Sequence, residues 1–329
     1  MKNILLFCLC LFSLETMALV KKQTLMFNTQ AQPVTVSGIS SGAFFATQML
    51  VAHSTRIRGV ASIAGGIYNC AEGSAQKAQS TCMANPQAID VAAQVKKAQE
   101  LSDAGKIDNV RNLKSARAYI FSGKSDYIVR SDASVKLKEF FAQWMKPEQI
   151  MTNFEVSAGH GWITASYGNS CGMSMSPWIN NCGVNVPGDF MQFLSKLSQE
   201  SVTESNQANL YEFDQTPYNI EKSGMAKTGF IYVPKKCEQN NSVCRAHISF
   251  HGCAMGAEYV QSTFATHSGL NEWAEANNVI VLYPQVVKSS EMNNPNGCWD
   301  WYGYTGPDYI TRKGPQIQSV FNMIQQFFK

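Results

Sequence analysis

The chain of 329 residues carries little charge, because only 16% of its residues are charged and 27 Lys and Arg face 24 Asp and Glu. No segment is densely basic, so the sequence offers no strong field for a polyanion, and nucleic acid is not an expected partner. Hydrophobic residues make up 45% of the chain, which is enough for a substantial core. We therefore expect one α/β domain, and a monomer.

Long hydrophobic runs are also scarce. The run 4–12 follows the basic Lys2, precedes Thr16-Met17-Ala18, and is too short to span a bilayer. This arrangement is typical of a signal peptide cleaved after Ala18, with an uncleaved amphipathic anchor as the alternative. We predict a signal peptide at 1–18, a single catalytic domain at 19–329, and a secreted protein, extracellular or periplasmic, without stable membrane insertion.

Motifs for metal binding are missing: the chain has no CxxC pair and no HExxH, so structural zinc is disfavoured and no metal or cofactor is expected. Of the ten cysteines, Cys8 and Cys10 lie in the predicted signal peptide. The eight that remain are an even number, which is typical of disulfides in an exported chain. Connectivity cannot be deduced from sequence alone, but short spacings favour Cys70–Cys82, Cys171–Cys182 and Cys237–Cys244, which leaves Cys253–Cys298.

A serine framed by glycines stands near the start of the predicted mature chain, in Gly38-Ile39-Ser40-Ser41-Gly42. A short β-pattern at 33–37 precedes it, and a helical pattern at 43–53 follows it. The tight turn of a nucleophile elbow needs this strand–turn–helix context and small neighbours. We therefore predict Ser40 as the nucleophile.

Strand and helix patterns alternate through the rest of the chain, as in an α/β fold. Strands are predicted at 59–64, 116–122, 153–157, 229–233, 246–250 and 279–283, and helices at 134–144, 188–197, 263–277 and 316–328.

A serine nucleophile needs a base, and His160 is the best candidate among the five histidines. It lies in a Gly-His-Gly-Trp loop directly after the predicted strand 153–157, whereas His53 and His267 lie in helical patterns and His247 and His251 flank a strand. Asp126, after the strand 116–122, is the predicted acid; an Asx-turn is its alternative role. The order Ser40, Asp126, His160 is the order expected of α/β-hydrolases.

Acyl transfer also needs two donors for the developing oxyanion. The Ser41 backbone N–H follows the nucleophile and supplies one. The turn His251-Gly252-Cys253, after the strand 246–250, suggests the N–H of Cys253 as the other. A metal site at His247 and His251 is disfavoured, because their spacing brings ligands together on a helix and this run is extended.

The order of the elements is unusual for this fold, because the strand that precedes the oxyanion turn normally comes before the nucleophile strand. In this chain it comes last, with the helices and strand at 263–328. We predict a circularly permuted α/β-hydrolase fold with a mostly parallel sheet, helices on both faces and termini close together. The aromatic loop 296–304 is predicted either to form an apolar acyl pocket, through Trp299, Trp301 and Tyr304, or to pack in the core.

Together these segments resemble the single-domain, circularly permuted extracellular poly(3-hydroxybutyrate) depolymerases, over nearly the whole mature chain. The resemblance rests on Val36-Ser37-Gly38-Ile39-Ser40-Ser41-Gly42, Ala64-Gly65-Gly66-Ile67-Tyr68-Asn69-Cys70, Asn169-Ser170-Cys171, His251-Gly252-Cys253, Leu282-Tyr283-Pro284-Gln285 and Asn294-Pro295-Asn296-Gly297-Cys298-Trp299-Asp300-Trp301. It implies the same triad and oxyanion donors, and hydrolysis of short-chain polyhydroxyalkanoate esters at a surface crevice.

One position departs from the family pattern, which places a tryptophan where this chain has Tyr304. Three other functions stay open at this point: hydrolysis of small or feruloyl-type esters, peptidase activity, and a non-catalytic secreted binding protein on the same scaffold. The binding protein is disfavoured, because all the expected catalytic groups are present together, and peptidase activity is weaker still, because nothing in the sequence specifies a side-chain pocket.

Overall fold

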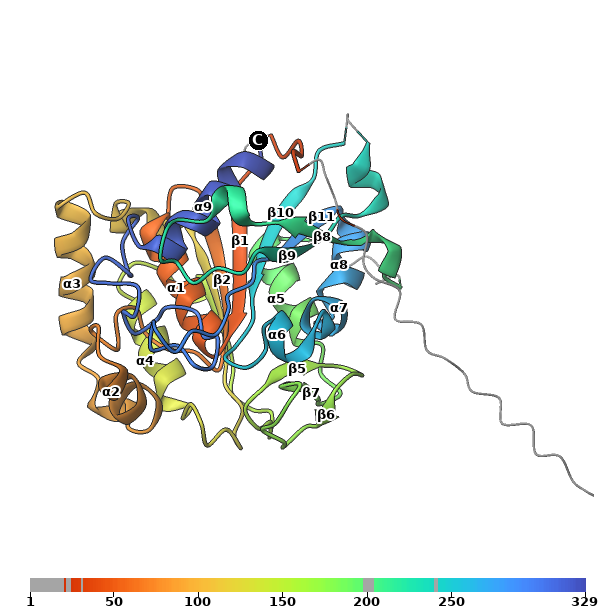
Figure 1. Ribbon diagram of the computed structural model, residues 1–329. Helices are drawn as coiled ribbons and strands as arrows, with labels where there is room; N and C mark the ends of the chain where they lie inside the picture. The colour runs from red at the N-terminus through yellow and green to blue at the C-terminus, as the bar shows by residue number, and fades with distance from the viewer. Residues whose placement is uncertain (1–20, 22–24, 31, 198–203, 240–241) are drawn as a thin grey trace, which may run out of the picture.

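The computed structural model describes residues 21, 25–30, 32–197, 204–239 and 242–329, so the predicted signal peptide 1–18 lies outside the described residues. A central eight-stranded sheet runs through the molecule with helices on both sides (Figure 1). Among the described residues, no helix is long and apolar enough to cross a membrane.

The order of strands across the central sheet is β4-β3-β2-β1-β10-β11-β9-β8. Only β9 runs antiparallel to its neighbours; the other pairs are parallel. The bounds are β1 Val34–Ile39, β2 Ile57–Ile63, β3 Arg117–Phe121, β4 Ile150–Asn153, β8 Leu210–Asp214, β9 Thr228–Tyr232, β10 Arg245–Phe250 and β11 Val279–Tyr283. A small second sheet contains β5 Trp162–Thr164, β6 Asn169–Ser170 and β7 Ile179–Asn181.

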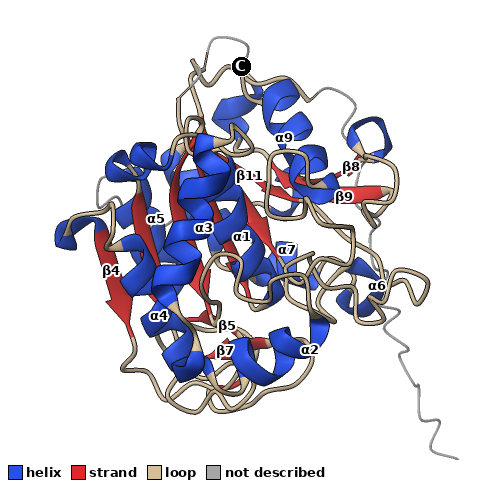
Figure 2. Ribbon diagram, turned by 90° about the vertical axis from the view of Figure 1, so that its left-hand side faces the viewer, coloured by secondary structure: helices blue, strands red, loops and turns tan. Residues whose placement is uncertain are grey.

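Helices cover both faces of the central sheet (Figure 2). One hydrophobic cluster joins the sheet to α1, α3, α4 and α9, and a second joins it to α5, α7 and α8. Their bounds are α1 Ser41–Ala52, α2 Ala75–Lys77, α3 Val91–Asp103, α4 Asp132–Phe141, α5 Val186–Ser195, α6 Ala257–Val260, α7 Thr263–His267, α8 Leu270–Asn277 and α9 Pro315–Phe327.

The inner strands of the sheet, such as β1, β10 and β11, are buried on both faces, which explains their continuous apolar character. Strand β11 is an example: Ile280 and Leu282 belong to one cluster, and Val281 and Tyr283 belong to the other. Alternate side chains of a strand point to opposite faces, so a single run of apolar residues supplies both cores.

The predicted circular permutation is present. Strand β1 lies between β10 and β2. It pairs with β10 although the two strands are more than two hundred residues apart in the sequence, and Thr35 lies opposite His247. Near the ends of the described chain, the Phe27 N–H donates to the Phe327 carbonyl at 2.7 Å, and the Lys329 N–H donates to the Phe27 carbonyl at 3.2 Å. The C-terminal helix α9 therefore leads in space toward β1, as the permutation requires.

Two predicted elements differ from the structure. The strand predicted at 153–157 lies at 150–153, because the Asn153 side-chain oxygen accepts from the Glu155 N–H at 3.2 Å and turns the chain out of the sheet. The helix predicted at 263–277 is two helices, α7 and α8. They are separated at Gly269, whose φ of +75° is a left-handed conformation that ends α7 and changes direction.

Strand β10 carries a buried histidine, and we expect it to make the protein sensitive to acid. The His247 ring is fully buried between the Thr35 hydroxyl, at 2.7 Å, and the Ser37 hydroxyl, at 2.8 Å. Burial lowers the pKa of His247 to about 3 from an ordinary value of 6.5. As the pH falls below 6.5 the unfolded chain binds this proton and the folded chain does not, so the free energy of unfolding should fall by about 1.4 kcal/mol per pH unit.

Urea unfolding between pH 7 and pH 4 measures this effect. The variant His247→Gln should be less stable at pH 7. Its free energy of unfolding should also fall less steeply as the pH is lowered, because the variant lacks the proton that His247 takes up on unfolding. His267→Gln, at a half-buried ring, is the control and should change the slope less. Equal slopes for wild type and His247→Gln would contradict the prediction.

Candidate active site

Ser40 stands at the tip of a strained turn between β1 and α1. Its φ of 55° and ψ of −122° lie in a region that non-glycine residues rarely occupy. Its own N–H donates to the Ile63 carbonyl at 3.0 Å, which fixes the turn against the next strand. Such strain is typical of functional sites, where the surrounding structure holds it in place.

The flanking glycines make this turn possible. A Cβ at Gly38 would lie 2.2 Å from the Gly42 carbonyl oxygen, and a Cβ at Gly42 would lie 2.3 Å from the His251 carbonyl oxygen. Neither distance is compatible with a side chain. The two glycines are therefore required by the close approach of the start of α1 to β1, at Gly38, and to the end of β10, at Gly42.

Asp126 and His160 form a buried pair. The His160 Nδ1 lies 2.8 Å from the Asp126 Oδ2, and the two side chains are 7% and 1% exposed. The other carboxylate oxygen, Oδ1, accepts from the N–H groups of Ile128 and Val129, each at 2.9 Å. Asp126 therefore closes a local turn and also bonds the histidine, so it makes the contacts that both predictions for this residue require.

The loop that carries His160 is held by the small sheet. The His160 N–H donates to the Ser174 hydroxyl at 2.8 Å. The Asn180 side-chain amide donates to the carbonyls of Cys171 and Met173, at 3.2 and 2.7 Å. The Cys171–Cys182 disulfide joins the same segments. Sequence reasoning did not find Asn180, because nothing local distinguishes it from other loop asparagines.

Ser40 and His160 open into the same cavity, of about 590 Å³. The Gly252-Cys253 turn also lines it. Most of the remaining lining is apolar and includes Ala78, Met83, Ile128, Trp178, Met255 and Trp301. The structure thus brings the predicted nucleophile, base and oxyanion turn to the wall of one apolar cleft.

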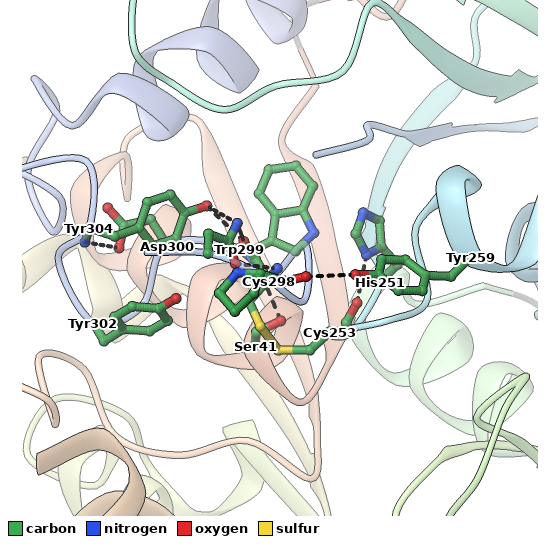
Figure 3. The surroundings of a disulfide bond; sticks show 12 residues. Ser41, His251, Cys253, Tyr259, Cys298, Trp299, Asp300, Tyr302 and Tyr304 are labelled. Carbon is green, nitrogen blue, oxygen red and sulfur yellow. Dashed lines mark hydrogen bonds between the residues drawn. A yellow bond between two sulfur atoms is a disulfide. The ribbon is translucent and has the colours of Figure 1, made fainter. Parts of the chain in front are cut away.

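The two predicted oxyanion donors are available. Ser41 is the first residue of α1, so its N–H has no partner within the helix. Among the described residues, neither this N–H nor the N–H of Cys253 donates to another protein group. The Cys253–Cys298 disulfide fixes the second donor to the aromatic loop, and the Trp299 N–H donates to the Ser41 hydroxyl at 3.4 Å (Figure 3).

Comparison with known proteins places this chain in a family. It is 30% identical over 315 residues to a polyhydroxybutyrate depolymerase of Talaromyces funiculosus, across 91% of each chain. The chain belongs to the polyhydroxybutyrate depolymerase family. It is also 34% identical to a poly(3-hydroxybutyrate) depolymerase of Delftia acidovorans, over 89% of this chain, which spans 59% of the length of that relative. No family model matches the chain.

Solved structures agree with this depolymerase assignment. A crystal structure of the PHB depolymerase from Penicillium funiculosum has a TM-score of 0.82 and 29% identity to this chain, and covers 92% of it. The same values hold for a serine-to-alanine variant of a PHB depolymerase complexed with an R3HB trimer. In both cases this chain covers 99% of the solved chain. The family is one of serine ester hydrolases, and the fold is the α/β-hydrolase fold.

The aromatic loop of this family member divides into a core part and a cleft part. Trp299 is fully buried, stacks on Phe45 at 4.6 Å and does not line the cleft. Trp301 does line it, and so does Tyr302, which was not predicted. Of the three aromatic residues predicted to form the pocket wall, Trp301 therefore lies there, together with Tyr302. Trp299 packs in the core, as the alternative prediction had it.

Tyr304 does not line the cleft either. Its hydroxyl donates to the Cys298 carbonyl at 2.7 Å and accepts from the side-chain amides of Asn294 and Gln316, at 3.0 and 2.6 Å. A tryptophan, which the family pattern has here, could not make these bonds. Tyr304 therefore supports the disulfide-bonded residue Cys298 rather than a ligand.

Three disulfides join the pairs that the sequence spacing favoured, Cys70–Cys82, Cys171–Cys182 and Cys237–Cys244, and the fourth joins the pair that remained, Cys253–Cys298. Three of the four lie beside the cleft or the loops that build it. Cys70–Cys82 closes the segment before Met83, Cys171–Cys182 supports the His160 loop, and Cys253–Cys298 joins the oxyanion turn to the aromatic loop. Four disulfides are typical of a protein from an oxidising compartment.

Proposed function

We propose that this protein hydrolyses the ester bonds of poly(3-hydroxybutyrate) or a related short-chain polyhydroxyalkanoate through an acyl-enzyme on Ser40. The observation that carries the proposal is the buried Asp126–His160 pair opening into the same apolar cleft as Ser40. The named activity of the relatives, and the R3HB trimer in the complex of a similar structure, support this class of substrate.

The geometry suggests a role for each group. The His160 Nδ1–H donates a hydrogen bond to the Asp126 carboxylate, so Nε2 carries the lone pair that takes the proton of the Ser40 hydroxyl. Ser40 Oγ then attacks the ester carbonyl, and the N–H groups of Ser41 and Cys253 stabilise the oxyanion. His160 returns the proton to the departing alcohol, and water activated by the same histidine releases the acid from the acyl-enzyme.

Exposed apolar side chains beside the cleft support a polymeric substrate. Tyr127, next to Asp126, is 71% exposed, and Met173 and Met175, on the loop that holds His160, are 44% and 49% exposed. Such side chains lose contact with water on a hydrophobic polyester surface, which favours adsorption. Apart from His160, the described residues that line the cleft include no acidic or basic side chain that could bind a charged substrate.

We further propose that the protein acts as a secreted monomer, extracellular or periplasmic, after removal of residues 1–18. The four disulfides support export, and the basic start and apolar run of the sequence support a cleaved signal peptide.

Clearing of a polymer suspension tests the proposed substrate. The purified protein should lower the turbidity of a poly(3-hydroxybutyrate) suspension and release soluble hydroxybutyrate oligomers, and it should also hydrolyse p-nitrophenyl butyrate. The same protein treated with a serine-directed phosphonate is the control and should do neither. Hydrolysis of p-nitrophenyl or feruloyl esters without clearing would overturn the polymer assignment and leave a small-ester esterase.

A further inference from the structure

His251 is a buried titratable residue that the proposed mechanism does not use. It follows strand β10 and lies two residues before Cys253, the predicted oxyanion donor. Its side chain has no exposed surface. A buried imidazole costs free energy unless both nitrogens are paired, so a histidine in this position calls for a physical reason.

Both ring nitrogens of His251 have backbone partners. Nδ1 lies 2.7 Å from the Gly252 carbonyl oxygen, and the Val286 N–H lies 3.4 Å from Nε2. A carbonyl can only accept and an N–H can only donate, so the proton is on Nδ1 and the lone pair is on Nε2. Burial lowers the pKa of His251 to about 4, so the ring is neutral at pH 7.

The Gly252 carbonyl belongs to the same peptide unit as the Cys253 N–H. This unit is planar and trans, so the direction of the carbonyl fixes the direction of the N–H on its opposite side. A hydrogen bond to the carbonyl also polarises the unit and strengthens the N–H as a donor. The His251 bond therefore acts on the orientation and the strength of the predicted oxyanion donor.

Two other contacts restrain the turn, and they act through the Cys253 side chain and the Ala254 N–H rather than through the Gly252 carbonyl. The Cys253 side chain is tied to Cys298, and the Ala254 N–H donates to the Asn296 carbonyl at 2.8 Å. Both contacts act after the Gly252–Cys253 peptide unit. Figure 3 shows His251 beside Cys253, and the centre of its ring lies 5.6 Å from the centre of the Trp299 ring.

We propose that His251 is a positioning residue of the oxyanion hole, which holds the Gly252–Cys253 peptide so that the Cys253 N–H faces the reacting carbonyl. This inference rests on the proposed function, because it assumes acyl transfer at Ser40. It assigns a role in the transition state to a residue that does not touch the substrate.

Steady-state kinetics on p-nitrophenyl butyrate test the proposal. Removing a whole oxyanion donor costs about 10²–10³ in kcat, so misdirecting one by His251→Leu should lower kcat about 10- to 100-fold. KM should stay within about twofold, because the donor acts mainly in the transition state. His251→Asn places an amide donor where Nδ1 stood and should recover most of kcat.

His247→Leu is the matched control, a buried histidine on the same strand whose partners are the Thr35 and Ser37 side chains. It should lower stability and leave kcat within about twofold of wild type. A folded His251→Leu variant with wild-type kcat would overturn the proposal, and so would an Asn variant no better than the Leu variant. Inhibition by a boronic acid should weaken in parallel with kcat.

The ring tautomer supplies a second measurement that does not depend on a variant folding. In wild-type protein labelled with ¹⁵N-histidine, the His251 ring should show a protonated Nδ1 and an unprotonated Nε2 between pH 5 and pH 8. A proton on Nε2 would overturn the proposal. Both tests use a soluble ester or no substrate, so failure to clear polymer would refute the proposed polymer function and leave this inference intact.

Discussion

Replacing Ser40 with alanine should lower kcat for p-nitrophenyl butyrate by about 10⁴- to 10⁶-fold, as removal of a serine nucleophile does in other hydrolases. The alanine keeps the Cβ and occupies the same strained conformation, so the turn, the disulfides and the unfolding temperature should change little. Turnover measured beside a circular dichroism spectrum and a free-thiol count checks both parts of the expectation.

Ser195→Ala is a suitable control for this experiment. Ser195 ends helix α5, away from the described lining of the cleft, and its replacement should leave kcat unchanged. Undiminished turnover in Ser40→Ala would refute the assignment of the nucleophile. A protein that loses turnover together with its fold would show instead that the strained turn depends on the serine hydroxyl.

The second large effect is expected at Asp126, where asparagine should lower kcat by about 10⁴-fold. The reason lies in the direction that the amide must take. Oδ1 of Asp126 accepts from two backbone N–H groups, of Ile128 and Val129. Only the oxygen of an asparagine can accept there, so its NH₂ must face His160.

This orientation of the amide changes the tautomer of the His160 ring. An NH₂ facing Nδ1 makes Nδ1 an acceptor and moves the ring proton to Nε2, where the lone pair for Ser40 was needed. The variant should fold normally, since the turn keeps its two bonds. Asp132→Asn, at the start of α4, is the control, and its side chain only accepts from Gln87. A kcat within tenfold of wild type in Asp126→Asn would refute this account of the pair.

Much of this site could be predicted from the sequence, because its residues stand at ends of elements with strong local patterns. Ser40 follows a short β-pattern and precedes an apolar helix, and Asp126 and His160 follow the next strands of the sheet. The circular permutation followed from the order of these elements. Three disulfide pairs followed from short spacing, since nearby cysteines are the ones that short loops bring together, and Cys253–Cys298 was left by elimination.

The parts that could not be predicted depend on contacts between distant segments. Strand β8 is an edge strand with the mixed sequence Leu-Tyr-Glu-Phe-Asp, which carries no clear period. Trp299 and Tyr302 are both aromatic, and only the packing of α1 against the loop decides that the first is buried and the second lines the cleft. The role we infer for His251 depends on a single carbonyl that no sequence pattern specifies.

The pairing of β1 with β10 has a consequence for how the protein becomes active during synthesis. Ser40, Asp126 and His160 leave the ribosome in the first half of the chain, but Cys253 and its disulfide partner Cys298 are made much later. Contacts of such long sequence separation form slowly, because the intervening loop must first be closed. The permuted order therefore leaves the predicted oxyanion hole incomplete until the segment 253–298 has been made, well after Ser40, Asp126 and His160.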